Sequence, residues 1–114
     1  MAACRYGRNI ARMIISNFNR AEKAFDVLQT ISKTQVATMR LAPGKASGPK
    51  GNEHPQSDQV LLVIEGEIYA EIGDEKTTLR KGDVVTVPAG VMHRFVNHGG
   101  SDALTVNIYS PPAY

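Results

Sequence analysis

Short runs of β-favouring residues recur roughly every ten positions along this chain, and turns rich in glycine, proline or charged residues separate them. Val, Ile, Thr and Tyr are concentrated in the second half, where this spacing is most regular. Strands that follow one another without helices between them are typical of a sandwich or a barrel. We therefore expect an all-β domain, with strands at residues 24–30, 34–41, 59–64, 68–72, 77–79, 84–88, 93–97 and 103–109.

Length and composition limit the chain to one domain. It has 114 residues, 42% of them hydrophobic, which is enough for a single core. The longest apolar run, residues 60–64, is far too short to span a membrane. A single cysteine, Cys4, excludes an internal disulfide framework and fits a reducing compartment, so we expect a cytoplasmic protein.

The basic residues are unevenly placed. Arg5, Arg8 and Arg12 lie in the first twelve residues, which contain no acidic residue, and the remainder is close to neutral. This remainder offers no basic face for nucleic acid. An acid-free, arginine-bearing start is compatible with an organelle presequence, but we favour a leader at residues 1–20 that is disordered or partly artefactual, with Met13 as an alternative start. Residues 21–114 would then form the β domain.

His93 begins a predicted strand directly after a tight turn. Pro88 ends the preceding strand with its fixed φ, and Gly90 allows the reversal that follows. His93 therefore faces inward, on the same strand face as Phe95 and Asn97. A single inward histidine in a β domain is more often a hydrogen-bonded core residue than a metal ligand.

His54 and Gln59 lie where a long irregular segment, residues 42–55, enters the strand at 59–64. Loops of this length in a compact domain are usually functional or disordered, and Pro55 keeps His54 extended. If the loop folds back beside His93, two imidazoles and an amide oxygen converge and can hold one divalent cation. From the spacing alone, a solvated His54 and a strand-capping Gln59 remain the better explanation.

Residues 82–97 resemble the second conserved motif of the cupin superfamily. They match the pattern G-x5-P-x-G-x2-H-x3-N at all its fixed positions, namely Gly82, Pro88, Gly90, His93 and Asn97. The resemblance covers about residues 24–112 and implies a small single-domain cupin with an RmlC-like jelly-roll β-barrel, a fold that the strand spacing also favours.

Residues 52–66 resemble the first cupin motif, G-x5-H-x-H-x3,4-E-x6-G, only in part. His54 falls on the second histidine and Gly66 on the closing glycine, but Asn52 and Gln59 replace the first histidine and the glutamate. The resemblance implies a divalent transition metal (Mn, Fe, Ni or Zn) bound by His54, His93 and Gln59. Some small sugar-ring-opening cupins resemble this chain in using a glutamine at the position of Gln59.

The fourth ligand position is open. Asn52 could bind the metal through its carbonyl, hold a water molecule, or do neither. Glu53 is a rival, although on an extended segment its side chain would point away from those of Asn52 and His54.

Two imidazoles and two amides leave the double charge of a metal uncancelled. Such a metal would polarise a carbonyl or acidify bound water, and it would attract anionic chelating groups. The favoured function is therefore Lewis-acid chemistry of the isomerase, ring-opening or lyase type on a small anionic organic molecule. A metal-dependent dioxygenase and a non-catalytic ligand-binding or sensor module are the alternatives, beside a purely structural role for a decayed site.

Several further side chains are candidates for lining a pocket, although each is more often part of a core: Met39, Tyr69, Met92, Phe95 and Tyr109. Arg40 and Arg94 could bind a substrate carboxylate, but a solvated outer strand face is the better expectation for both.

Residues 60–64 are apolar on both faces of their strand, whereas a half-exposed strand should alternate. We expect the strand at 24–30 to cover part of the second face and a second subunit to cover the rest. This arrangement predicts a homodimer, with a small-molecule ligand and neither nucleic acid nor membrane as further partners.

Overall fold

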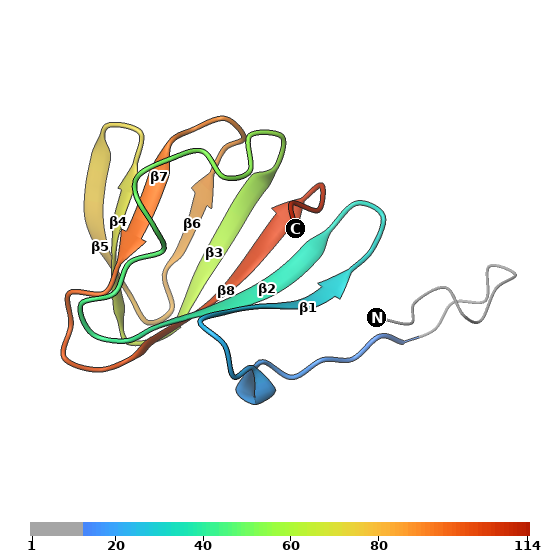
Figure 1. The fold of residues 1–114 in the computed structure, drawn as a ribbon, viewed down its shortest axis with the longest axis horizontal. Coiled ribbons are helices and arrows are strands. Elements are labelled where there is room, and N and C mark those ends of the chain that lie inside the picture. Colours follow the sequence, from blue (N-terminus) through green and yellow to red (C-terminus); the bar gives the residue numbers. More distant parts are fainter. Residues whose placement is uncertain (1–12) are drawn as a thin grey trace, which may run out of the picture.

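The structure, a computed structural model, describes residues 13–114. Eight strands follow a short 3-10 helix, η1 (Phe18–Arg20), as Figure 1 shows. The strands are β1 (Phe25–Thr30), β2 (Gln35–Leu41), β3 (Asp58–Glu65), β4 (Glu67–Ile72), β5 (Glu75–Arg80), β6 (Val84–Val87), β7 (His93–Val96) and β8 (Ala103–Ser110). The predicted all-β class is confirmed, and each strand lies within two residues of its predicted bounds. Expectations about residues 1–12 lie outside the described part of the chain.

The strands form two antiparallel sheets of a jelly roll. One has the order β1-β2-β8-β3-β6 and the other the order β5-β4-β7. In residues 13–114 no pair of named strands joins one sheet to the other. The jelly roll is therefore confirmed, but it is an open one, in which the barrel predicted from the sequence is not closed by hydrogen bonds.

The hydrophobic core lies on the inward faces of the two sheets. Leu61 and Val63 of β3 are fully buried, as are Ile68 of β4 and Phe95 of β7. Burying one such side chain contributes about 1.5–3 kcal/mol. Because side chains alternate along a strand, Gln59 shares the inward face of β3 and continues the core with a polar group.

Two covers were expected for the outer face of β3, the strand at residues 24–30 and a second subunit, and the first of them is wrong. The strand β1 pairs with β2 at the edge of the same sheet, so it cannot lie over β3 (Figure 1). The outward residues Val60 and Leu62 are only half-buried, and in register they meet Ile108 and Val106 of β8, which are half-buried too. An apolar outer face therefore remains on the five-stranded sheet.

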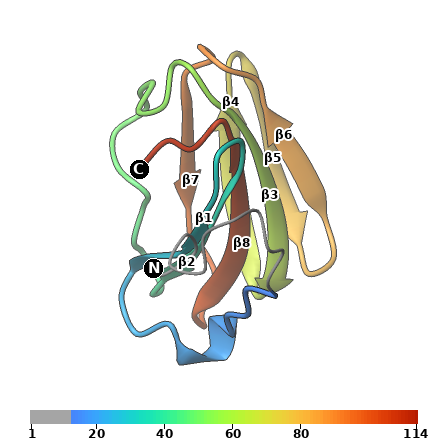
Figure 2. The same cartoon turned by 90° about the vertical axis from the view of Figure 1, so that its right-hand side faces the viewer.

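The loop between β2 and β3 crosses the molecule beside β7 (Figure 1). Ala46 pairs with Val96 and Gly51 with His93 as isolated antiparallel bridges. The amide of residue 47 also donates to the Phe95 carbonyl at 2.8 Å. The loop therefore acts as an irregular fourth strand of the smaller sheet, on the side where the C-terminal segment also lies (Figure 2). In the described part of the chain, no helix is long and apolar enough to cross a membrane.

Candidate functional site

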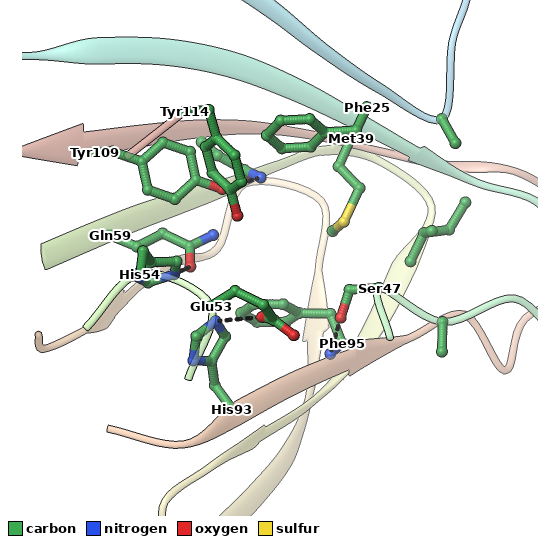
Figure 3. A pocket seen from close by; sticks show the side chains of 14 residues that line it. Phe25, Met39, Ser47, Glu53, His54, Gln59, His93, Phe95, Tyr109 and Tyr114 are labelled. Carbon is green, nitrogen blue, oxygen red and sulfur yellow. Dashed lines mark hydrogen bonds and ion pairs between the residues drawn. The ribbon is translucent and has the colours of Figure 1, made fainter. Parts of the chain in front are cut away.

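A cavity of about 340 Å³ opens between the two sheets where the apolar core ends. It is large enough for a small organic molecule. Figure 3 shows its walls, which come from β1, β2, β3, β7, β8, the loop before β3 and the C-terminal segment. The lining residues are Ala24, Phe25, Met39, Leu41, Ala46, Ser47, Glu53, His54, Gln59, His93, Phe95, Asn107, Tyr109 and Tyr114.

The turn before β7 aims His93 into this cavity, as the sequence predicts. Gly90 has a φ of 85°, which favours glycine, and the Val91 amide donates to the Pro88 carbonyl at 3.1 Å to close the turn. His93 is then buried, with 4% of its surface exposed. Its Nδ1 lies 2.9 Å from the Val91 carbonyl, which accepts the Nδ1–H. The lone pair of His93 is therefore on Nε2.

His54 reaches the same cavity from the loop. It is 4% exposed, and its Nδ1 lies 3.1 Å from the Ser57 carbonyl, so that Nδ1 is the protonated nitrogen here too. Its Nε2 lies 2.8 Å from Oε1 of the buried Gln59. The loop does fold back beside β7, so that the His54 and His93 rings are 4.6 Å apart between centroids. The solvated His54 that the spacing alone favoured is therefore wrong.

This donor set fits a bound cation. Both imidazoles donate Nδ1–H to backbone carbonyls, the outer contact that orients most metal-binding histidines. The Nε2 lone pair of His54 faces the side-chain amide of Gln59 at 2.8 Å, which can donate to it through its NH2 group or turn its oxygen to a cation shared with the imidazole. Within residues 13–114 no three His, Cys, Asp or Glu side chains form a metal cluster, so a metal here depends on the amide.

Of the two candidates for the fourth position, Glu53 lines the cavity and Asn52 does not. Asn52 is exposed, and its Nδ2 donates to the Gly90 carbonyl at 3.3 Å. The Glu53 carboxylate points toward His93, with Oε2 3.6 Å from Nε2 (Figure 3). The expectation that the Glu53 side chain would point away from His54 is wrong, because the chain bends at Glu53 and strand alternation does not apply there.

The other candidates divide between cavity, core and surface. Phe95, Tyr109 and Met39 line the cavity, whereas Tyr69 packs against the exposed His98 ring at 5.2 Å and Met92 is 50% exposed. Arg40 and Arg94 are not among the lining residues. Phe25 and Tyr114 were not predicted, because β1 gave no sign of facing a cavity and Tyr114 follows the last strand.

Two motif residues have structural roles. The Asn97 side chain donates to the carbonyls of Leu41 and Ser101 and accepts the Gly99 amide, each at 2.8 Å, so it braces the turn that follows β7. Gly66 has a φ of 77°, and a Cβ there would lie 2.7 Å from the Asp102 carbonyl oxygen. Only glycine allows this approach of two backbones.

The cavity carries little positive charge of its own. In the described part of the chain, its lining includes one carboxylate, Glu53, and neither lysine nor arginine. Burial, with smaller contributions from neighbouring acidic groups, raises the pKa of the Tyr109 phenol far above its ordinary value, and burial also raises the pKa of Tyr114. Both phenols are therefore neutral hydrogen-bonding groups near neutral pH.

Comparison with known proteins gives a family match and relatives of mixed function. The cupin domain family matches residues 37–109. The auxin-binding protein ABP19a of Prunus persica is 39% identical over 75 residues, which are 58% of this chain and 36% of that protein. The tetracenomycin polyketide synthase protein TcmJ of Streptomyces glaucescens is 33% identical over 75 residues, 66% of this chain and 49% of that protein. The chain thus spans between a third and a half of these two relatives.

Solved structures agree with the fold. The crystal structure of BH2720 from Bacillus halodurans superimposes with a TM-score of 0.81 and 26% sequence identity, covering 90% of this chain and 84% of that one.

Proposed function

Because the chain belongs to the cupin family, we propose that it binds one divalent transition metal through His54, His93 and Gln59. We further propose that it acts on a small anionic organic molecule by Lewis-acid chemistry of the isomerase, ring-opening or lyase type. When bound, the metal would polarise a ligand carbonyl or acidify a water molecule. Manganese, iron, nickel and zinc all suit two imidazoles and an amide oxygen.

One observation carries this proposal. Two buried imidazoles and one buried amide, from residues 54–59 and from β7, meet at the wall of one cavity. Their orientation is set in advance, since each Nδ1 is bound to a backbone carbonyl. Preset donors lose little conformational entropy on binding a cation, which favours a metal over a merely structural histidine pair.

The charges of the cavity support an anionic ligand only if the metal is present. No basic side chain lines the cavity in residues 13–114, and the Glu53 carboxylate would repel an anion. Glu53 lies beside His93 and is half-exposed to solvent, so it is placed to take a proton from a bound ligand and pass it to water. Binding of an anion should therefore depend on the metal.

Elemental analysis of purified protein tests the metal site. Wild-type protein incubated with a first-row transition metal should retain it, and His93→Ala should lose it. His98→Ala is the matched control, since His98 is an exposed histidine outside the cavity. Equal metal in all three proteins, or none in any, would contradict the proposal.

A non-catalytic binding role is the second candidate, and the similarity to the auxin-binding protein ABP19a of Prunus persica supports it. Metal-loaded protein that binds small carboxylates and never converts them would favour this role. A dioxygenase would consume oxygen with iron and be inactive with zinc, whereas Lewis-acid turnover should persist with zinc.

We also propose a homodimer formed through the outer face of the five-stranded sheet. The half-buried Val60, Leu62, Val106 and Ile108 form adjoining rows on that face, and a second copy related by a two-fold axis would place apolar rows against one another. Sedimentation should give a dimer for the full chain and a monomer for Leu62→Lys. A chain starting at Met13 should still form the dimer, because the proposed face lies on β3 and β8.

A further inference from the structure

Six rings form a continuous arc around the cavity, each in contact with the next. Neighbouring centroids are 4.6 to 6.0 Å apart, within the range of favourable aromatic pairs. Two of the six are the imidazoles of the metal site, and the other four are carbocyclic. In order along the arc they are Phe25, Tyr114, Tyr109, His54, His93 and Phe95.

Tyr114 belongs to this arc because Gln35 holds the backbone that carries it. Gln35 is 1% exposed, and its Oε1 accepts the amides of Ala113 and Tyr114 at 3.0 and 2.9 Å. Its Nε2 donates to the Tyr114 carbonyl at 2.7 Å and to Thr30 Oγ1 at 2.9 Å. Every hydrogen-bonding position of this buried amide is therefore in use, three of the four on residues 113 and 114.

The arc divides the cavity into two ends. Figure 3 shows Phe25, Met39 and Tyr114 at one end, and His54, His93 and Glu53 at the other. The first end offers ring faces, a thioether and the Tyr114 hydroxyl, whereas the second offers metal donors and a carboxylate. A ligand that fills both ends needs an apolar, flat body and a polar group that reaches the histidines.

We propose that Phe25, Tyr109 and Tyr114 form a subsite for the planar ring of a ligand whose acidic group lies at the histidine end. Gln35 is the positioning residue, which keeps Tyr114 in the wall of this subsite. The inference rests on the proposed function in one respect, because the acidic group is held there by the metal. The site then selects ring-bearing acids over aliphatic ones, since ring faces stack on a flat body.

Titration calorimetry of the metal-loaded chain with phenylacetate, cyclohexylacetate and acetate tests the subsite. Wild-type protein should bind phenylacetate more tightly than either of the others. Tyr114→Ala should weaken phenylacetate binding about three- to tenfold, the range of one aromatic contact, and leave acetate unchanged. Tyr114→Phe should keep the preference. Equal phenylacetate affinity in wild type and Tyr114→Ala would overturn the subsite.

The positioning role of Gln35 is tested by a measurement that would not change if Gln35 only stabilised the fold. Gln35→Glu keeps the size and the accepting oxygen but replaces the donor that binds the Tyr114 carbonyl. This variant should bind phenylacetate more weakly and acetate with unchanged affinity. Combined with Tyr114→Ala it should cause no further loss of phenylacetate affinity, since both substitutions remove the same wall of the subsite. Additive losses, or equal losses for both acids, would overturn the positioning role.

A binding experiment on metal-free protein tests the ring subsite independently of the proposed metal site. Benzyl alcohol carries the ring without an acid, and its binding to metal-free protein is followed by nuclear magnetic resonance. Weaker binding by Tyr114→Ala supports the subsite even if the chain takes up no metal, in which case the proposed function alone fails. Metal-dependent acetate binding without any ring preference would leave the proposed function standing and remove the subsite.

Discussion

The backbones of Gly51 and His93 exchange two hydrogen bonds, His93 N–H to the Gly51 carbonyl at 2.9 Å and Gly51 N–H to the His93 carbonyl at 3.2 Å. This pair fixes the loop against the edge of β7, three residues before His54. Because His54 follows so soon in the chain, the bridge also sets how close the two imidazoles lie. The geometry of the candidate metal site is therefore set in part by a backbone contact, and not by side-chain contacts alone.

Gln59→Glu should raise metal affinity by at least about tenfold, because a charged carboxylate would then replace a neutral amide among the ligands. Gln29→Glu is the matched control, since Gln29 lies on β1 and does not line the cavity. Competition with a coloured chelator measures both. Unchanged affinity in Gln59→Glu would place the metal away from this side chain.

Asn52→Ala and Glu53→Gln should separate the two candidates for the fourth ligand position. Asn52 is exposed and bound to the Gly90 carbonyl, so its loss should change metal affinity by less than about twofold. Glu53→Gln removes the carboxylate that faces His93 and should weaken metal binding severalfold. The reverse order of effects would mean that the loop rearranges when a cation binds.

Gly66→Ala should destabilise the fold by about 2 kcal/mol or more, because the new Cβ would meet the Asp102 carbonyl at 2.7 Å. Gly82→Ala is the control: Gly82 also has a positive φ, of 93°, but no atom lies within 4 Å of the added group. Gly82→Ala should lower the free energy of unfolding by about 1–2 kcal/mol, the cost of holding an alanine at a positive φ. Urea unfolding compares them, and equal losses would show that the contact at Gly66 does not matter.

Alkaline pH should destabilise the fold through Tyr109. Burial raises the pKa of this phenol in the folded chain above its ordinary value of 10.0. Its contribution to stability is fully present below that value and is lost as the pH rises toward the folded pKa, because the unfolded chain releases the proton first. The free energy of unfolding should fall above about pH 10, and less steeply in Tyr109→Phe. Identical pH profiles would contradict the burial of a neutral phenol.

The first cupin-like motif could be read from the sequence only in part. Pattern matching correctly places His54 in the loop, Gln59 in β3 and Gly66 in the turn after β3, because all three positions lie in or near a regular strand. It names Asn52 as a ligand with Glu53 as a rival, and in the structure Glu53 lines the cavity whereas Asn52 does not. The expected direction of the Glu53 side chain is wrong, because alternation of side chains holds in strands and fails at a bend.

The strand positions, the turn at Pro88–Gly90 and the inward face of His93 follow from the sequence alone. Alternation and the backbone limits of proline and glycine act over a few residues and need no distant partner. Tertiary structure decided that Tyr114 lines the cavity and that the loop joins β7. Gln35 binds a segment 78 and 79 residues further along the chain, and no local pattern encodes a contact between such distant, irregular segments.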